Sequence, residues 1–210
     1  MAYAPDTRER LLDAAIDLMY ARSYAGVGVQ ELCEHAGVKK GSFYHFFPSK
    51  CDLTIAALDR QAETFQQTVL GPAFAKTLAP LTRIETLFDL LYRKTREMKK
   101  KSGRVLGCAL GNLASELSTQ EEPIRRKVSS IFNSMMQVVQ RTLDDAVADG
   151  EIATQDTRAT AEAIVAYMEG VMLLAKTRND PEIIHHLGRA YLRGLAGEVS
   201  HRREPTGTKV

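Results

Sequence analysis

The sequence is poor in cysteine and lacks long apolar runs, and both shortages narrow what the protein can be. Its 210 residues include three cysteines and no tryptophan. Three cysteines cannot all pair with one another within one chain, so no disulfide framework is expected. Free thiols suit a reducing compartment.

No stretch of the sequence reads as a membrane span. The longest apolar stretch, residues 163–175, contains Glu169 and Gly170 and is shorter than the roughly 20 apolar residues that cross a bilayer. Charged residues such as Asp6 and Arg8 interrupt the N-terminus where a secretory signal needs an apolar run. We therefore expect a cytoplasmic protein with no membrane partner.

Charge and composition indicate an ordinary globular protein. Hydrophobic residues make up 44% of the chain and charged residues 26%, which excludes wholesale disorder. The net charge is only +2, so overall charge favours no class of partner and only local clusters are informative. The length allows one large domain, or a small and a larger one, whose core needs no disulfide or metal.

Apolar side chains recur with the period of an α-helix along almost the whole chain. Leu11, Ala15 and Met19, for example, share one face of the first predicted helix. No alternating pattern typical of a strand runs for more than about four residues. We therefore predict an all-α fold of about nine helices. Their expected positions are residues 7–21, 29–36, 40–46, 50–69, 81–100, 105–117, 123–148, 157–178 and 181–201, followed by a flexible tail over 202–210.

The second and third predicted helices have the dimensions of a helix-turn-helix motif. Residues 36–39 join them, and Gly37 can adopt the left-handed conformation of a tight turn. Residues 36–51 contain three lysines and no acidic residue. Because lysines and hydroxyl groups bind phosphates and short polar side chains reach base edges, this outer face suits a DNA groove. The alternative is a solvated helical face.

Three motifs make the first quarter of the chain similar to a known family. The A-G-V turn at residues 36–38 is followed by G-S-F-Y-H-F-F at 41–47 and S-K-x-D-L at 49–53. Over residues 7–57 the sequence resembles the DNA-binding domain of the TetR family of bacterial transcription regulators. The resemblance implies a helix-turn-helix DNA-binding domain over residues 1–50 and a ligand-sensing and dimerisation domain over 51–201. It also implies a homodimer that binds a palindromic operator until a small-molecule inducer releases it, with activation as the alternative to repression.

The resemblance assigns DNA contacts residue by residue. The residues expected to contact DNA are Gln30, Lys39, Lys40, Ser42, Tyr44, His45 and Lys50. Lys50, at the start of the fourth helix, matches the family's phosphate-binding lysine, and the helix N-terminus would add its dipole to that contact. Phe43 and Phe47 match core positions. Relatives usually have serine or threonine where Gly28 stands, so the phosphate contact of that side chain is not expected here.

In this family a ligand enters among the helices of the C-terminal domain and shifts the fourth helix, so that the two DNA-binding heads no longer match the groove spacing. Candidate pocket residues combine large adaptable apolar groups with a few polar ones. They are Tyr92, Met98, Cys108, Asn112, Phe132, Met135, Tyr167, Met168 and Met172. The alternative for each of them is an ordinary place in the core.

The last two predicted helices are rich in small residues, which let helices approach closely. They are Ala159, Ala161, Ala163, Ala166, Gly170, Ala190, Gly194 and Ala196. Together with Ile164, Val171, Leu187 and Leu195 they could form a four-helix bundle between two subunits. The resemblance makes this the expected homodimer face, and ordinary core is the alternative.

Cys108 lies in a G-C-x-x-G-N segment at residues 107–112. The segment resembles a branch of TetR-type repressors, several of which control genes for detoxifying electrophiles or handling unsaturated small acids. In some members a cysteine at this position is the sensor. The neighbouring Arg104 and Lys101 favour the thiolate, which is the reactive form. Alternatively, Cys108 is a small buried hydrophobe. Cys33 is expected in the core, whereas the first helical turn around Cys51 can lower a thiol pKa.

Other function classes have weaker support. Cys33, His35, His45 and Cys51 match no zinc-binding spacing, and we expect no metal and no cofactor. The basic run over residues 93–104 is either a second nucleic-acid surface or a solvated helix end. No catalytic motif is found, so we expect no enzyme and no catalytic residue. The alternative function is a helical small-molecule-binding protein or enzyme without specific DNA binding.

Overall fold

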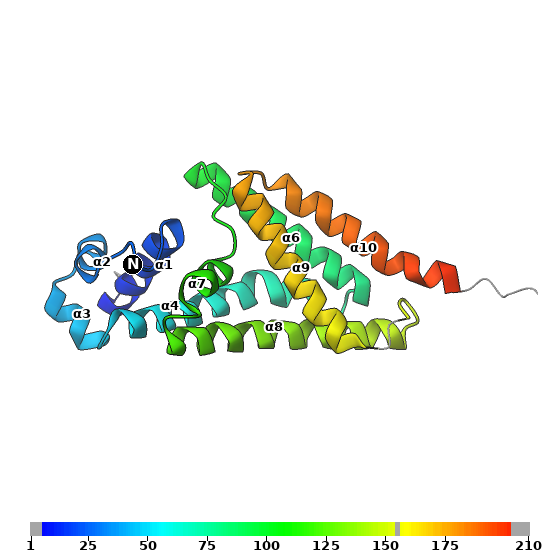
Figure 1. Cartoon of the computed structure of the whole chain (residues 1–210), viewed down its shortest axis with the longest axis horizontal. Coiled ribbons are helices and arrows are strands. Elements are labelled where there is room, and N and C mark those ends of the chain that lie inside the picture. Colours follow the sequence, from blue (N-terminus) through cyan, green and yellow to red (C-terminus); the bar gives the residue numbers. More distant parts are fainter. Residues whose placement is uncertain (1–5, 154–155, 203–210) are drawn as a thin grey trace, which may run out of the picture. The chain divides into compact units, whose positions relative to one another are not determined.

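The computed structural model describes residues 6–153 and 156–202, and every secondary-structure element within these ranges is helical (Figure 1). The predicted all-α fold is confirmed. In chain order the elements are α1 (Thr7–Ala21), α2 (Val29–Ala36), α3 (Lys40–Phe46), α4 (Lys50–Phe65), the π-helix η1 (Gln66–Leu70), α5 (Gly71–Ala73), α6 (Pro80–Ser102), α7 (Ala109–Leu117), α8 (Glu122–Ala148), α9 (Thr157–Thr177) and α10 (Glu182–Arg202). The predicted tail lies, from residue 203, outside the described residues.

Helix ends follow local signals in the sequence. Gly37 (φ 63°) ends α2 and Gly103 (φ 76°) ends α6, both in the left-handed conformation that glycine adopts without strain. Pro80 begins α6, where a missing N–H group costs nothing. Asp156 caps α9 by accepting a hydrogen bond from the N–H of Ala159 at 2.9 Å.

Two predicted boundaries differ from the structure by four residues, whereas the others agree within two. The predicted helix over residues 50–69 ends as α4 at Phe65 and continues as the π-helix η1. A π-helix inserts an extra residue into a helical turn, which apolar periodicity does not reveal. The helix predicted over residues 105–117 begins only at Ala109, because Gly107 has a φ of 79° and Cys108 is extended.

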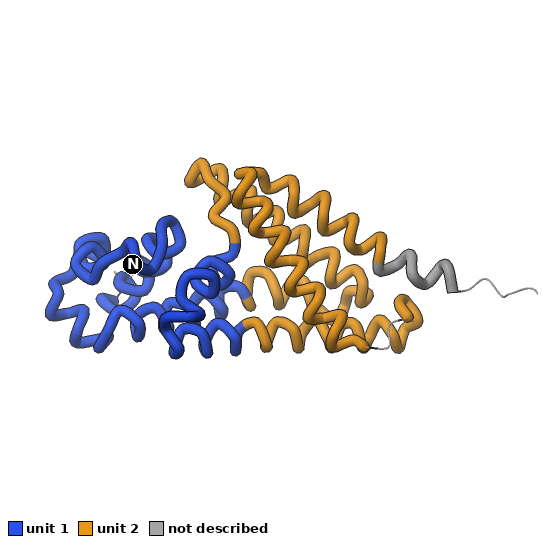
Figure 2. Tube along the Cα trace, viewed as in Figure 1, with its two compact units in different colours: residues 1–65, 108–131 blue, residues 66–107, 132–210 orange. Residues whose placement is uncertain are grey.

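The chain divides into two compact units (Figure 2). Unit 1 comprises residues 1–65 and 108–131, and so combines α1–α4 with α7 and the beginning of α8. Its core buries Leu11, Leu32, Phe43 and Leu53 completely, and α1 packs against α2 and α4. Burial of each such side chain favours folding by about 1.5–3 kcal/mol. The predicted domain boundary at residue 50 lies within this unit and stays a prediction.

Unit 2 comprises residues 66–107 and 132–210, and within it α10 packs against α6 and α9. Ile84 and Ile164 are fully buried in its core. Arg83 is buried as well, and it donates hydrogen bonds to Asp145 (2.5 Å) and to the carbonyl of Leu78 (2.9 Å), which offset the cost of burying its charge. Among the described helices, none combines the length and apolar character needed to cross a membrane.

Asn179, in the turn between α9 and α10, holds the segment that follows α6. Its side-chain oxygen accepts a hydrogen bond from the N–H of Val105 (2.8 Å), and its amide nitrogen donates to the carbonyl of Gly103 (3.3 Å). Its own carbonyl accepts from Lys99 (2.6 Å). Within unit 2, Asn179 therefore joins the turn after α9 to the segment that follows α6.

We expect Gly188→Ala to destabilise the protein. A Cβ atom at this position of α10 would lie 2.7 Å from Cγ of Phe88, which is closer than real Cβ contacts. Because Phe88 is buried on α6, its ring cannot move aside cheaply, and we expect a loss of about 1–3 kcal/mol in unfolding free energy. Urea unfolding at a fixed protein concentration measures it.

Gly41→Ala is the matched control for this substitution. A Cβ atom at this position of α3 meets nothing within 4 Å, so we expect a gain of up to about 1 kcal/mol from reduced freedom of the unfolded chain. Equal stabilities of the two variants would contradict the close contact between α10 and α6.

Candidate nucleic-acid interface

Helix α3 is fixed by two buried aromatic side chains. Phe43 is fully buried and Phe47, just after the helix, is 4% exposed, with ring centroids 6.2 Å apart. Both α1 and α2 pack against α3. A helix of seven residues is too short to be stable alone, so these contacts hold it. The prediction that both phenylalanines are core residues is confirmed.

The outer face of α3 carries exposed polar side chains. Tyr44 is 51% exposed, Lys40 and His45 are also exposed, and Ser42 is partly exposed. Lys39, directly before the helix, is exposed as well. No acidic residue lies on α3. This short helix therefore offers ammonium groups for phosphates and polar side chains for base edges, in a size that the major groove admits.

Helix α2 begins without a side-chain cap. Its N-cap residue, Gly28, has an extended backbone and no side chain to bond the first N–H groups of the helix. Such a helix end favours an anion. Gln30 is exposed on the first turn of α2, and its amide donates a hydrogen bond to Glu34 at 2.8 Å.

Lys50, the first residue of α4, is engaged within unit 1. Its ammonium donates hydrogen bonds to the carbonyl oxygens of Tyr24 (3.0 Å) and Val27 (3.1 Å). It also lies 3.9 Å from the centre of the Tyr24 ring. Burial lowers the pKa of Lys50, whereas the charges of Glu116 and Glu121 raise it. Two of its three N–H donors bond the α1–α2 loop (residues 22–28). Only the third is left for a DNA phosphate, and that contact stays a prediction.

Glu116, on α7, binds the same loop. Its carboxylate accepts hydrogen bonds from the backbone N–H groups of Tyr24 (2.9 Å) and Ala25 (2.7 Å). Glu116 is absent from the predicted interface because its partners are backbone atoms more than 90 positions away in the chain. A contact between a side chain and a distant backbone leaves no pattern in the sequence.

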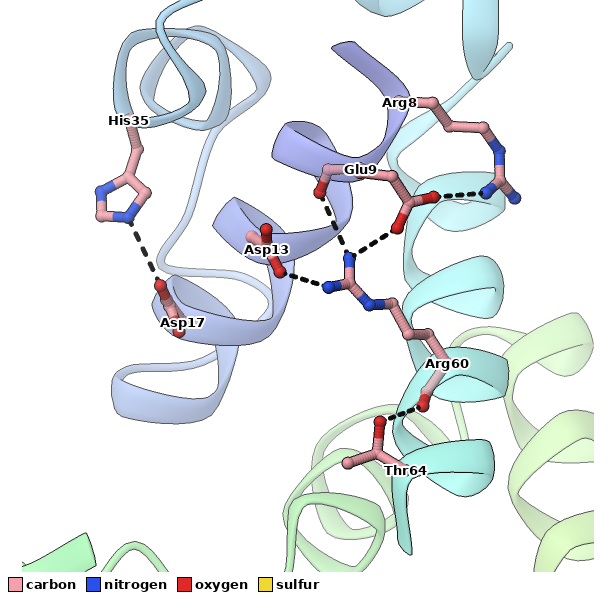
Figure 3. Close-up of polar contacts among 7 residues, drawn as sticks. All are labelled: Arg8, Glu9, Asp13, Asp17, His35, Arg60 and Thr64. Atoms are coloured by element: carbon pink, nitrogen blue, oxygen red, sulfur yellow. Dashed lines mark hydrogen bonds and ion pairs between the residues drawn. The ribbon is translucent and has the colours of Figure 1, made fainter. Parts of the chain in front are cut away.

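Helix α4 is anchored in two directions by adjacent residues. Figure 3 shows Arg60 reaching α1, where it forms ion pairs with Glu9 (3.1 Å) and Asp13 (2.7 Å). Asp59 pairs instead with Lys127 of α8 at 2.9 Å. Exposed pairs of this kind contribute about 1 kcal/mol or less each. Because neighbouring helical residues point about 100° apart, the pairs together restrain rotation of α4.

Two of the cysteines are placed in less reactive surroundings. Cys33 is buried in the core as predicted, and burial raises the pKa of its thiol. The suggestion that the helix start lowers the thiol pKa of Cys51 is wrong, because burial raises that pKa and the nearby Glu121 and Asp52 raise it further. Within the described ranges, no group of three or more His, Cys, Asp or Glu side chains could hold a metal ion.

Cys108 is the N-cap residue of α7. Its backbone is extended, and its partly exposed sulfur accepts a hydrogen bond from the N–H of Gly111 at 3.5 Å. Oxygen side chains are the usual caps and sulfur is a weak acceptor, so this cap contributes less than a serine would. The position nevertheless ties the thiol to the start of a helix that contacts the α1–α2 loop.

The other residues predicted to line a pocket are distributed over both units. Asn112 is on α7 in unit 1, and the rest lie in unit 2 on α6, α8 and α9. Those of unit 2 are Tyr92, Met98, Phe132, Met135, Tyr167, Met168 and Met172. Tyr92 donates its hydroxyl hydrogen to Glu182 (2.5 Å), and Tyr167 donates to the carbonyl of Leu187 (3.0 Å). Both phenols thus bond α10, and the pocket assignment stays a prediction.

Helix α9 carries an exposed stripe of small and apolar residues at helical spacing. The stripe consists of Ala159, Ala163, Ala166, Gly170 and Leu173. Leu173 is 60% exposed. On α10, Ala190 and Gly194 are exposed as well. The homodimer face itself stays a prediction.

Some residues predicted for that face lie elsewhere. Ile164, Val171 and Ala161 are buried within unit 2, because they lie on the side of α9 that packs into its own core. The side chains of Leu195 and Ala196 lie outside the described residues.

Two family models match the sequence. The model described as bacterial regulatory proteins of the tetR family matches residues 11–57. The model described as the tetracyclin repressor-like C-terminal domain matches residues 80–191.

Known relatives match over most of the chain. The transcriptional regulator AcuR of Cereibacter sphaeroides is 31% identical over 193 residues, which cover 90% of this chain and 86% of that protein. A crystal structure of a regulatory protein TetR from Rhodobacter sphaeroides has a TM-score of 0.78 at 30% identity, covering 89% of this chain and 97% of that one. The reduced form of the Escherichia coli repressor NemR has a TM-score of 0.78 at 25% identity, covering 90% and 97%.

Tyr24 offers a pH test of the α1–α2 loop. Burial raises the pKa of Tyr24 to about 12, and the charges of Glu121, Cys51 and Glu116 act in the same direction. The unfolded chain ionises this phenol at the ordinary pKa of 10.0. The folded state therefore retains the proton longer, and the resulting stabilisation is complete below pH 10 and is lost as the pH rises to 12.

We expect the unfolding free energy of the wild type to fall more steeply between pH 10 and 12 than that of Tyr24→Phe. The difference should reach at most about 2 kcal/mol, because the partly exposed ring is screened by solvent. Urea unfolding at intervals across this range measures it, with Tyr44→Phe as the exposed control. Parallel pH profiles of wild type and Tyr24→Phe would contradict the described environment of the ring.

Proposed function

The chain belongs to the TetR family of bacterial transcription regulators, and from that premise we propose that it is a repressor that leaves its operator when a small-molecule inducer binds or when Cys108 is modified. It is a regulator with a helix-turn-helix motif and not an enzyme. The observation that supports its action on DNA is the exposed, acid-free outer face of α3 above the buried ring of Phe43. We place the protein in the cytoplasm, where its operator lies.

The proposed operator contacts combine phosphate binding and base recognition. Lysine ammonium groups and the Tyr44 hydroxyl suit phosphates, whereas Ser42 and His45 suit base edges. The full proposed set is Gln30, Lys39, Lys40, Ser42, Tyr44, His45 and Lys50. A homodimer through α9 and α10 would present two α3 helices to successive major grooves, about 34 Å apart, and so select a palindrome.

Cys108 is proposed as the sensor because its thiol is partly exposed and also caps the start of α7. An electrophilic alkene would react with the thiolate, forming a carbon–sulfur bond as the carbon–carbon π bond breaks, and the second carbon takes up a proton. The adduct would place bulk at the start of α7. The related repressor NemR has a crystal structure named for its reduced form.

We expect Tyr44→Ala and Lys40→Ala to weaken operator binding about tenfold, because each removes a contact at the centre of the proposed interface. Binding of purified protein to DNA from upstream of its own gene, measured over a range of salt concentrations, tests this. Lys40→Ala should also reduce the salt dependence by about one phosphate contact.

Lys100→Ala is the control for a general effect of positive charge. This exposed lysine belongs to the basic run over residues 93–104 in unit 2. Unchanged affinity of this variant confines the interface to the helix-turn-helix motif. An equal loss for Lys100 and Lys40 would contradict the assignment and identify the basic run as a nucleic-acid surface.

We expect N-ethylmaleimide to release the wild type from its operator and to leave Cys108→Ser bound. Serine is a preferred N-cap residue, so the variant should keep α7 folded while removing the nucleophile. Mass spectrometry confirms which thiols react, with Cys33 and Cys51 as internal references. If the wild type, with Cys108 completely alkylated, stays on DNA as the Cys108→Ser variant does, the sensor role is wrong and a reversible ligand is the signal.

A further inference from the structure

Two charged side chains of opposite sign from outside the α1–α2 loop bond its backbone. Glu116 accepts hydrogen bonds from the N–H groups of Tyr24 and Ala25, and Lys50 donates to the carbonyls of Tyr24 and Val27. Tyr24 takes part in both sets, since its N–H bonds the acid, while its carbonyl and ring contact the ammonium. A displacement of Glu116 would therefore alter the position of Tyr24 and, through it, the hydrogen bond of Lys50.

This loop decides where α2 begins. Val27 is fully buried, and its N–H donates to the carbonyl of Tyr24 at 3.3 Å. Gly28 then starts α2 without a side-chain cap, so the loop rather than a cap sets the position of the helix. Helix α2 packs directly against α3. The placement of the loop thus determines both the uncapped end of α2 and the support of the proposed recognition helix.

We propose that Glu116 is a positioning residue for operator binding. Its carboxylate holds the α1–α2 loop so that Lys50 and the N-terminus of α2 are correctly placed for DNA phosphates. The inference rests on the proposed function, since it concerns the same interface. It adds a residue of α7, outside the helix-turn-helix motif, to the groups that determine DNA affinity.

A charge effect and a positioning effect predict opposite changes in DNA affinity when Glu116 is neutralised. Removing an acid near a DNA-binding surface reduces repulsion of the phosphates, so a purely electrostatic residue would tighten binding when neutralised. A positioning residue would weaken it. Glu116→Gln keeps the side-chain shape but places an amide N–H₂ group against a backbone N–H donor, so at least one of the two hydrogen bonds is lost.

Glu121→Gln is the matched control. The charge of Glu121 also acts on Lys50, whereas the N–H groups of the loop bond to Glu116. The control therefore removes the same charge from the same neighbourhood and leaves the two hydrogen bonds in place.

The experiment measures two quantities for the full-length wild type and both variants. The first is amide hydrogen exchange in the peptide that spans the α1–α2 loop, and the second is affinity for the operator fragment that the wild type binds. In Glu116→Gln we expect loop exchange to accelerate about tenfold and operator affinity to fall about tenfold. In Glu121→Gln we expect unchanged exchange and equal or slightly tighter binding.

Three results would overturn the inference. Faster loop exchange with unchanged or tighter DNA binding would show that Glu116 holds the loop without positioning the interface. Weaker binding of both variants would show that the loss does not depend on the two hydrogen bonds that Glu116 accepts from the loop. Accelerated exchange in the core of α1 as well, around Leu11, would show that the substitution loosens the whole of unit 1. A wild type that binds no operator DNA contradicts the proposed function itself, so the two failures are distinguishable.

Discussion

The proposed interface depends on the burial of Phe43. Helix α3 has seven residues, and a helix of this length is unstable in water without partners. Burying one phenylalanine ring contributes about 1.5–3 kcal/mol, and Phe47 adds a second anchor just past the helix end. Since successive helical residues point about 100° apart, fixing Phe43 inward turns Tyr44 outward. The core thus determines which side chains of α3 are available to a partner.

The α1–α2 loop is held in place by polar contacts, whereas α3 is held by apolar ones. Its backbone N–H and C=O groups leave the regular bonding of α1 and need other partners. Glu116 and Lys50 supply an acceptor and a donor of full charge, and such charge-assisted hydrogen bonds are about twice as strong as neutral ones. The residues that complete the hydrogen bonding of the loop therefore also restrain it. Arg60 and Asp59 restrain α4, the helix that begins with Lys50.

Local sequence patterns predicted the helices and the outer face of α3 because these depend on residues a few positions apart. The turn at Gly37 and the exposed Tyr44 follow from such local patterns, whereas the burial of Phe43 was implied by the family resemblance. The hydrogen bonds of Glu116 and Lys50 to the α1–α2 loop could not be predicted in this way, since they join side chains to backbone atoms far away in the chain. The same limit explains the inward direction of Ile164 on α9, because packing against a neighbouring helix decides which side of α9 is buried.

Cys108, the proposed sensor, caps helix α7, and Glu116, the proposed positioning residue, lies on it. Energetic magnitudes decide how the first could affect the second. An N-cap contributes about 1 kcal/mol, and the weak sulfur acceptor of Cys108 contributes less. Leu110, Leu113 and Leu117 hold the same helix by burial, each for about 1.5–3 kcal/mol. Loss of the cap alone therefore cannot unfold α7 or release Glu116. If Cys108 is the sensor, the proposed modification would therefore act through the volume that it adds at the start of α7, two positions before the buried Leu110, and not through loss of the cap.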